Sequence, residues 1–258
     1  MKTSTVNATT IALLLLTTLL SGGCSTAPSK QSGQPLSAPY YERDRMMIND
    51  TDAPLEINDP WEGMNRSIYR FNSYADKYFL NPAVSAYNFV LPGFVRKGIS
   101  NFFTNLDNIQ TVVNEVLQLH GGSALQTTGR LLVNTTVGLA GLFDPATPMG
   151  IPQHYEDFGQ TLGRWGVPTG PYLVLPLYGP SFARDAGGKV VDAEVFNLID
   201  PLQLDDVNEG YTYAYYALLV LNTRATTSFQ YYQTGSPFEY ELVRLIWATK
   251  RKLDIEKY

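Results

Sequence analysis

The residues of this chain that could do chemistry are few. It has one cysteine, Cys24, and two histidines, His120 and His154. One cysteine excludes a disulfide framework and a zinc site built from cysteines. The sequence also lacks the P-loop, dinucleotide-binding, zinc-protease and nucleophile-elbow motifs. We therefore expect the chain to bind no nucleotide and to carry no cofactor.

Two weak constellations of reactive residues remain. Ser123, His120 and Asp144 could form a hydrolytic triad, but a histidine at the C-terminal end of a helix also suits the helix dipole. His154 precedes two acidic residues and could bind a metal weakly, whereas an ordinary polar loop explains the same cluster. The sequence therefore predicts neither an enzyme nor a metal site.

The composition narrows the choice of partners. Charged residues make up 17% of the 258 residues, against about 25% in ordinary soluble domains. The formal net charge is −5, so the chain lacks the basic face that binding to nucleic acid requires. We expect no nucleic-acid partner and a surface with fewer charges than usual.

The N-terminus has the pattern of a bacterial export signal. An apolar run from Ile11 to Leu20 suits a signal peptide and is too short to span a bilayer. The small residues before Cys24 resemble a lipoprotein cleavage site, which predicts a signal peptide over 1–23 and an acylated Cys24. A serine stands where such sites usually have leucine, so an ordinary signal with an incidental cysteine stays open. Ser25 after the cysteine favours the outer membrane, by resemblance to sorting rules.

The mature chain is predicted to begin with a flexible, acylated tether over residues 24–57. This segment is rich in Ser, Pro and Gln and cannot bury enough apolar surface to order itself. The folded body is predicted to span 58–258. No segment shows the repeated period-2 alternation of strands, so we expect an all-helical body.

The first helix of the body has a clear start in the sequence. Asp59 can cap it, Pro60 fits its first position, and Glu62 completes a capping box. Apolar residues then recur at steps of three and four, from Trp61 onward. This spacing predicts an amphipathic helix that faces the core and ends before Pro82.

The middle of the body is almost free of charge. Residues 78–95 hold no charged residue, but their interior prolines argue against a membrane span and favour a short helical hairpin. Two further helices are predicted over 99–106 and 109–117, and Ser123 with Gln126 can cap the next one.

The C-terminal half is predicted to mix irregular backbone with helices. Between Pro145 and Pro180, frequent prolines and glycines leave room for one short helix over 158–165 and one extended piece over 172–177. Ser181 can cap a helix running to about Phe196, and an aromatic helix is predicted over 211–233. A capping box at Ser236–Glu239 then starts a last helix, which ends at Lys250–Lys252 in solvent.

Four segments in order resemble the MlaA/VacJ family of outer-membrane lipoproteins. The resemblance runs from about 58 to 252. Its segments are NDPWEGMNR at 58–66, with Asn65 and Arg66 completing the motif of Asp59, Pro60 and Glu62; NTTVGLAGLFD at 134–144; EDFGQTLG at 156–163; and LPLYGPSFARD at 175–185.

The resemblance implies a fold and a function. Members of this family form a ring-like bundle of short helices that lies within the outer membrane, with irregular connections rich in Gly and Pro. The ring encloses an amphipathic channel, through which misplaced outer-leaflet phospholipids pass to a periplasmic lipid-carrier protein. Members associate with trimeric porins and perform no chemistry on the lipid. The alternative is a structural lipoprotein that braces porins without moving lipid.

We expect the lipid path to lie near the second of these segments. Gly138 and Gly141 stand three residues apart, one helical turn if the helix continues, in a stretch where packing alone would accept larger residues. Asn134 and Phe143 flank them and complete the predicted path. Turn geometry and helix ends are the other explanation for these glycines.

Overall fold

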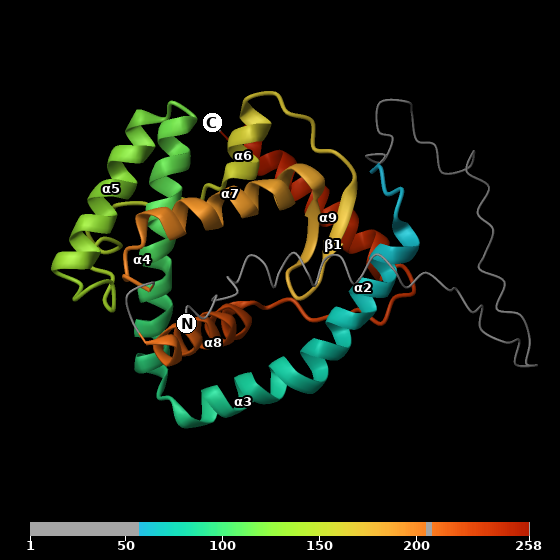
Figure 1. Ribbon diagram of the computed structural model, residues 1–258, viewed down its shortest axis with the longest axis horizontal. Helices are drawn as coiled ribbons and strands as arrows, with labels where there is room; N and C mark the ends of the chain where they lie inside the picture. The colour runs from blue at the N-terminus through green and yellow to red at the C-terminus, as the bar shows by residue number, and fades with distance from the viewer. Residues whose placement is uncertain (1–56, 205–207, 258) are drawn as a thin grey trace, which may run out of the picture. The chain divides into compact units, whose positions relative to one another are not determined.

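The computed structural model describes residues 57–204 and 208–257 (Figure 1). The predicted signal peptide, Cys24 and the tether up to residue 56 lie outside the described residues, so these predictions stay untested. The described residues all belong to one structural unit, Pro54–Tyr258.

The first helical arm is longer than the sequence predicted. Helix α2 (Glu62–Ala75) continues through a π-helical turn, η2 (Asp76–Leu80), into α3 (Asn81–Val90). The predicted end before Pro82 was wrong because Pro82 lies in the first turn of α3, where a backbone N–H is not needed. The π-helical turn just before it takes up the change in hydrogen-bond register.

Two long helices form the next part of the unit. After a break at Leu91–Pro92, α4 (Gly93–Leu117) runs unbroken for 25 residues, where the sequence predicted two helices. Helix α5 (Gly121–Thr136) returns along α4 (Figure 1). The predicted cap at Ser123 was wrong, because α5 begins two residues earlier, with His120 at its N-cap position.

The Gly- and Pro-rich region contains little regular structure, as predicted. Its short helix is α6 (Phe158–Arg164), which Asp157 caps through a capping box with Gln160. Strands β1 (Tyr172–Leu175) and β2 (Gly179–Phe182) form an antiparallel hairpin that pairs Tyr172 with Phe182. Ser181 lies in β2 and caps no helix; the next helix, α7 (Ala183–Ile199), has Phe182 at its N-cap.

The last two helices are α8 (Glu209–Thr226) and α9 (Glu239–Glu256). The aromatic helix predicted over 211–233 therefore ends early, at Thr226. The predicted capping box at the start of α9 was wrong, since no side chain caps this helix. The Glu239 carboxylate instead accepts hydrogen bonds from Tyr69 and from the backbone of Tyr232.

The apolar core is small and rich in tyrosine, and it lies where α2, the β-hairpin and α9 meet. Its buried members are Tyr69, Tyr172, Val174, Phe182 and Tyr240. Tyr69 lies edge-to-face with Tyr240, with ring centroids 5.8 Å apart. This aromatic packing fixes the first helical arm against the C-terminal helix.

Contacts between elements close into a circuit. From α2 it passes through η2 and α3 to α8, then to α4, α7, β2 and β1, and so back to α2. The all-helical class is confirmed, with the β-hairpin as its small exception. None of the described helices combines the length and apolarity that crossing a membrane would require. That the circuit encloses a channel stays a prediction.

Candidate functional site

The interface between α4 and α5 is polar. Polar residues recur every third position along α4 from Asn105 to Asn114, and their side chains are buried. The buried polar residues of the two helices are Asn105, Asn108, Thr111, Asn114 and Glu115 on α4 and Thr127, Arg130 and Asn134 on α5. Asn105 donates to Thr135 Oγ1 across the interface at 2.9 Å. Polar side chains therefore line the interior where a water-soluble helix pair would place apolar ones.

Large apolar side chains are exposed on α3, α4 and α5. Leu125 and Leu132 of α5 are 74% and 60% exposed. Phe89 at the end of α3 and Phe94 at the start of α4 are 90% and 80% exposed. Exposed apolar surface on this scale marks contact with lipid or with another protein.

The first helix shows the same inversion. The face of α2 that contacts the rest of the protein carries Asn65, Tyr69 and Asn72, whereas Met64 and Phe71 are about half exposed. The predicted core-facing apolar stripe was therefore wrong for Met64 and Phe71, although Ile68 packs against the core. Asn72 donates to the carbonyl of Leu175, so the polar face of α2 is hydrogen-bonded to the β-hairpin.

The loop after α5 has an unusual backbone. Leu139, Ala140 and Gly141 have φ angles of 53°, 58° and 90°, so three consecutive residues are in the left-handed region. Non-glycine residues adopt this conformation at a cost of about 1–2 kcal/mol each, and such strain is concentrated at functional sites. The apolar side chains of this loop are nevertheless exposed, with Phe143 at 61%.

Polar groups of α5 and of the following residues hold the strained loop in place through hydrogen bonds. Asn134 accepts a hydrogen bond from Gly141 N through its carbonyl and one from Ala146 N through its side chain, at 2.8 and 3.1 Å. Asp144 accepts from Asn134 and forms an ion pair with Arg130 at 2.6 Å. Burial raises the pKa of Asp144, but the hydrogen bonds from Thr147 and Asn134 and the Arg130 charge outweigh it and leave the pKa below its usual value.

The structure places Asn134 in the last turn of α5 and Gly138, Gly141 and Phe143 in the loop that follows, and it gives the four predicted path residues different roles. Asn134 is buried and supports the backbone. Gly138 and Gly141 lie beyond the end of α5, so the assumption that they are one helical turn apart was wrong. A Cβ on Gly138 would come within 2.4 Å of Phe143 O, and one on Gly141 within 2.6 Å of Asn105 Cβ. Of the four, Phe143 alone presents a side chain to the outside.

The two weak catalytic and metal constellations are not assembled. Both oxygens of Asp144 already accept hydrogen bonds from Arg130, Asn134 and Thr147, so this carboxylate is not available to orient His120. Glu156 accepts from Gln118 and pairs with Lys257, and Asp157 bonds Arg251. Among residues 57–204 and 208–257, no group of three His, Cys, Asp or Glu side chains could hold a metal ion.

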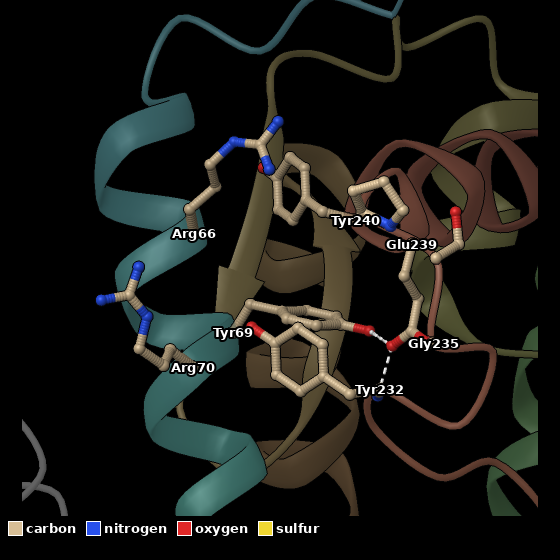
Figure 2. A pocket seen from close by; sticks show the side chains of 9 residues that line it. Arg66, Tyr69, Arg70, Tyr232, Gly235, Glu239 and Tyr240 are labelled. Carbon is tan, nitrogen blue, oxygen red and sulfur yellow. Dashed lines mark hydrogen bonds between the residues drawn. The ribbon is translucent and has the colours of Figure 1, made fainter. Parts of the chain in front are cut away.

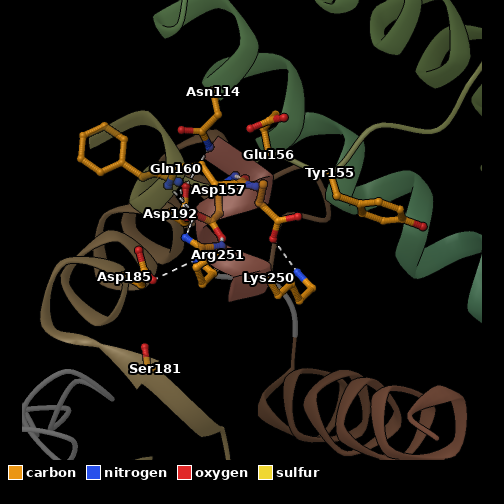
Figure 3. Close-up of polar contacts among 12 residues, drawn as sticks. Asn114, Tyr155, Glu156, Asp157, Gln160, Ser181, Asp185, Asp192, Lys250 and Arg251 are labelled. Atoms are coloured by element: carbon orange, nitrogen blue, oxygen red, sulfur yellow. Dashed lines mark hydrogen bonds and ion pairs between the residues drawn. The ribbon is translucent and has the colours of Figure 1, made fainter. Parts of the chain in front are cut away.

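A buried ionic cluster ties α6, α7 and α9 together (Figure 3). Arg251 of α9 bonds both oxygens of Asp157 at 2.8 and 2.9 Å, and bonds Asp185 of α7 at 2.9 Å. Burial tends to lower the pKa of Arg251, but the hydrogen bonds and charges of these aspartates raise it above its usual value. The prediction that Lys250–Lys252 form a solvated helix end was wrong for Arg251, which is 5% exposed.

The N-terminal motif forms a second polar hub. No side chain caps α2, so the predicted capping box was wrong. Asp59 instead accepts hydrogen bonds from Asn65, Tyr240 and Arg244 at 2.7, 2.6 and 2.8 Å. Glu62 pairs with Arg66 one turn later. These bonds join the start of α2 to α9, which lies about 180 positions further along the chain.

Sequence reasoning missed the polar interior. Asn101 donates to Leu142 O, and Asn105 contacts Gly141, so α4 holds the strained loop from its other side. The signal was present, because the asparagines at 101, 105 and 108 recur at helical spacing. The prediction of helices in this region rested on the apolar residues between them.

The fold and the site define a class: a helical protein with an apolar exterior, a polar interior and a strained loop at their boundary. The family model for the MlaA lipoprotein matches residues 57–254. The chain belongs to this family.

Relatives and a solved structure are similar over much of the chain. An uncharacterised protein of Rickettsia felis is 39% identical over 55% of this chain and 57% of its own length. The Escherichia coli protein named intermembrane phospholipid transport system lipoprotein MlaA is 34% identical over 70% of this chain and 64% of its own length. The matched region thus spans less than two thirds of these relatives. A solved chain, from work on the structural basis for maintenance of bacterial outer membrane lipid asymmetry, superposes with a TM-score of 0.62 at 29% identity; it covers 77% of this chain and 99% of that one.

Proposed function

We propose that this protein is an outer-membrane lipoprotein that moves phospholipid. It removes mislocalised phospholipids from the outer leaflet through an amphipathic channel and passes them to a periplasmic lipid carrier, which maintains the asymmetry of the membrane. Membership of the MlaA lipoprotein family supports this function. So does the similarity to proteins named for intermembrane phospholipid transport.

The observation that carries the proposal is the inverted polarity of α4 and α5. A polar interior and an apolar exterior suit a body that lies in lipid, because lipid solvates exposed apolar side chains and leaves polar groups to pair internally. A phospholipid needs the same two environments, one for its headgroup and one for its acyl chains. No covalent chemistry on the lipid is required.

Deletion of the gene tests this function. Loss of the protein should raise the amount of phospholipid exposed on the cell surface, and re-expression of the full chain should restore the normal level. Lipid labelling at the cell surface measures both. An unchanged outer leaflet in the deletion strain contradicts the proposal.

The proposal includes a lipid anchor and protein partners. Acylation of Cys24 would hold the protein at the membrane, and mass spectrometry of the mature N-terminus tests it; an unmodified Cys24 refutes it. A periplasmic carrier and a trimeric porin are the proposed partners. Crosslinking in intact cells followed by purification of the tagged protein should recover both.

A structural lipoprotein that braces porins is the second candidate. Helix α8 favours it, because Tyr211, Tyr213 and Tyr216 are 55%, 70% and 47% exposed and could dock on another protein. Phospholipid that co-purifies with the protein in mild detergent supports transport. A protein that recovers porin but no lipid, and whose loss leaves the outer leaflet normal, supports the bracing role.

A further inference from the structure

A cavity of about 340 Å³ opens between α2 and the start of α9 (Figure 2). It lies apart from the α4–α5 interface and the strained loop. Its wall is amphipathic, with arginines on one side and aromatic rings on the other. The lining residues are Arg66, Tyr69 and Arg70 of α2, Tyr232, Gly235, Ser236 and Pro237 of the preceding turn, and Glu239 and Tyr240 of α9.

Both oxygens of the carboxylate in this wall, Glu239, already accept hydrogen bonds. One oxygen of Glu239 accepts from Tyr69 Oη at 2.8 Å and from Tyr232 N, and the other accepts from Thr234 N and Oγ1 at 3.1 and 2.7 Å. Burial raises the pKa of Glu239, but the hydrogen bonds from Thr234 and Tyr69 outweigh it and leave the pKa below its usual value. With four donors in place, Glu239 stays ionised and has no free site for a cation.

The two arginines differ in what they already bind. Arg66 is paired with Glu62 and Glu241, and its guanidinium lies 4.3 Å from the centre of the Tyr240 ring. Arg70 stands one helical turn further along α2, is exposed, and makes no hydrogen bond or ion pair with the described residues. Its five N–H donors are therefore available to a ligand.

Guanidinium groups bind phosphate oxygens through paired hydrogen bonds. The volume suits a headgroup and not a pair of acyl chains. Tyr232 and Phe238 beside the cavity are 50% and 54% exposed, so an apolar chain attached to the headgroup would continue over aromatic rings.

We propose that this cavity binds the phosphodiester headgroup of a membrane phospholipid, with Arg70 as the residue that contacts the phosphate. The site would hold a lipid outside the α4–α5 region, as it enters or leaves the path. The inference rests on the proposed transport function for its choice of a lipid over a free phosphate.

Binding to the purified full-length protein tests the site. The probe is dihexanoyl phosphatidylglycerol below its micelle concentration, and calorimetry measures the affinity. Arg70→Gln should weaken binding roughly ten-fold or more, because a charge-assisted hydrogen bond is lost. Lys97→Gln removes an exposed cation of α4 and should leave the affinity unchanged. Since Arg70 is exposed and makes no contact that the fold needs, its variant should fold normally.

Two further probes separate the sources of phosphate. Dihexanoyl glycerol, which has no phosphate, should not compete, and inorganic phosphate should bind far more weakly than the lipid. Equal affinity of wild type and Arg70→Gln, or tight binding of the phosphate-free probe, overturns the site. Inorganic phosphate that binds as tightly as the lipid overturns the lipid assignment.

The same variant in cells distinguishes this site from the proposed function. Lost binding with normal outer-leaflet lipid keeps the binding site but shows that it plays no part in transport, which overturns its proposed place beside the lipid path while transport stands. Binding that depends on Arg70 in a protein whose deletion leaves the outer leaflet normal keeps the site and refutes transport.

Discussion

At the scale of single residues, the buried polar side chains of this protein work as connectors. Asp59, Asn134 and Arg251 each join segments that are far apart in the sequence or strained in the backbone. A buried charge that loses its partner costs about 3–5 kcal/mol. Single substitutions at these positions should therefore have larger effects than their location in motifs or loops suggests.

Asp59 provides the clearest case. If it were only a helix cap, Asp59→Ser would be tolerated. Because its carboxylate bonds Tyr240 and Arg244, we expect Asp59→Ser and Asp59→Ala both to lower the free energy of unfolding by roughly 3 kcal/mol. Denaturant titration measures the change, with Glu194→Gln on α7 as an exposed control. An Asp59→Ser variant as stable as wild type contradicts the proposed role of Asp59 in joining α2 to α9.

Substitutions at Gly141 and at Phe143 test two different things. Gly141 tests the backbone geometry of the loop, and Phe143 tests the lipid path. Gly141→Ala forces a side chain into φ +90° and against Asn105, so stability should fall by about 2–4 kcal/mol and with it the protein level. A bulky residue at Gly141 therefore cannot report on a path.

Phe143 can report on it, because its side chain is exposed. Phe143→Asp should keep the protein level and raise surface phospholipid, whereas Phe143→Leu should be neutral. Immunoblotting and surface lipid labelling measure the two quantities. A normal outer leaflet with Phe143→Asp removes Phe143 from the path.

Asp107 should make stability depend on pH. The surrounding protein desolvates this carboxyl and raises its pKa to about 6, although the side chain keeps exposed surface. A raised pKa means that the folded state holds the proton longer than the unfolded state, so Asp107 favours folding at low pH and loses this contribution as pH rises from about 4 to 6.

The melting temperature of wild type relative to Asp107→Asn should therefore fall across that range. The comparison isolates Asp107 from groups such as Asp157, whose pKa is lowered and which act in the opposite direction. Parallel melting curves for the two proteins between pH 4 and 6 contradict the assignment.

At the scale of elements, one ion pair links the first helical arm to α8. Arg224 of α8 bonds both oxygens of Asp76, the first residue of the π-helical turn. The two side chains are 14% and 7% exposed, so water screens them little. This pair supports the contact between α3 and α8 that closes the circuit of elements.

Breaking the pair should loosen α8. Asp76→Asn should lower stability by roughly 3 kcal/mol and speed amide exchange in α8 more than in α9. The double variant with Arg224→Gln should cost less than the sum of the single changes, because the partners are already separated. Additive effects, or exchange that is uniform over both helices, contradict the link.

At the scale of the whole molecule, the apolar exterior should bind membranes without the acyl anchor. Full-length Cys24→Ala protein should still float with phospholipid vesicles, because exposed residues such as Phe89 and Phe94 gain by leaving water. Adding Phe89→Ser and Phe94→Ser should reduce the floating fraction. Sedimentation of the anchor-less protein away from vesicles contradicts an apolar exterior that contacts lipid.

The sequence by itself determined the helical class, the short helix at α6, the extended piece at β1 and the membership suggested by four motifs. These features depend on local signals: proline and glycine positions and helical spacing. The predicted path residues came from a nearly charge-free stretch with recurring small residues, and the structure places them at the end of α5 and in the strained loop after it.

Only the tertiary structure decided which face of each helix is inside. Periodicity gives the two faces of a helix but does not say which one meets the protein, and the usual assumption of an aqueous exterior led to the wrong placement of Met64 and Phe71 on α2. Tertiary contacts also decided the roles of Asp59 and Arg251, because their partners lie on elements distant in sequence. A helix cap or a solvated helix end can be inferred from neighbouring residues alone. A buried hydrogen bond between a carboxylate and a guanidinium from distant parts of the chain is stronger than either of these local interactions.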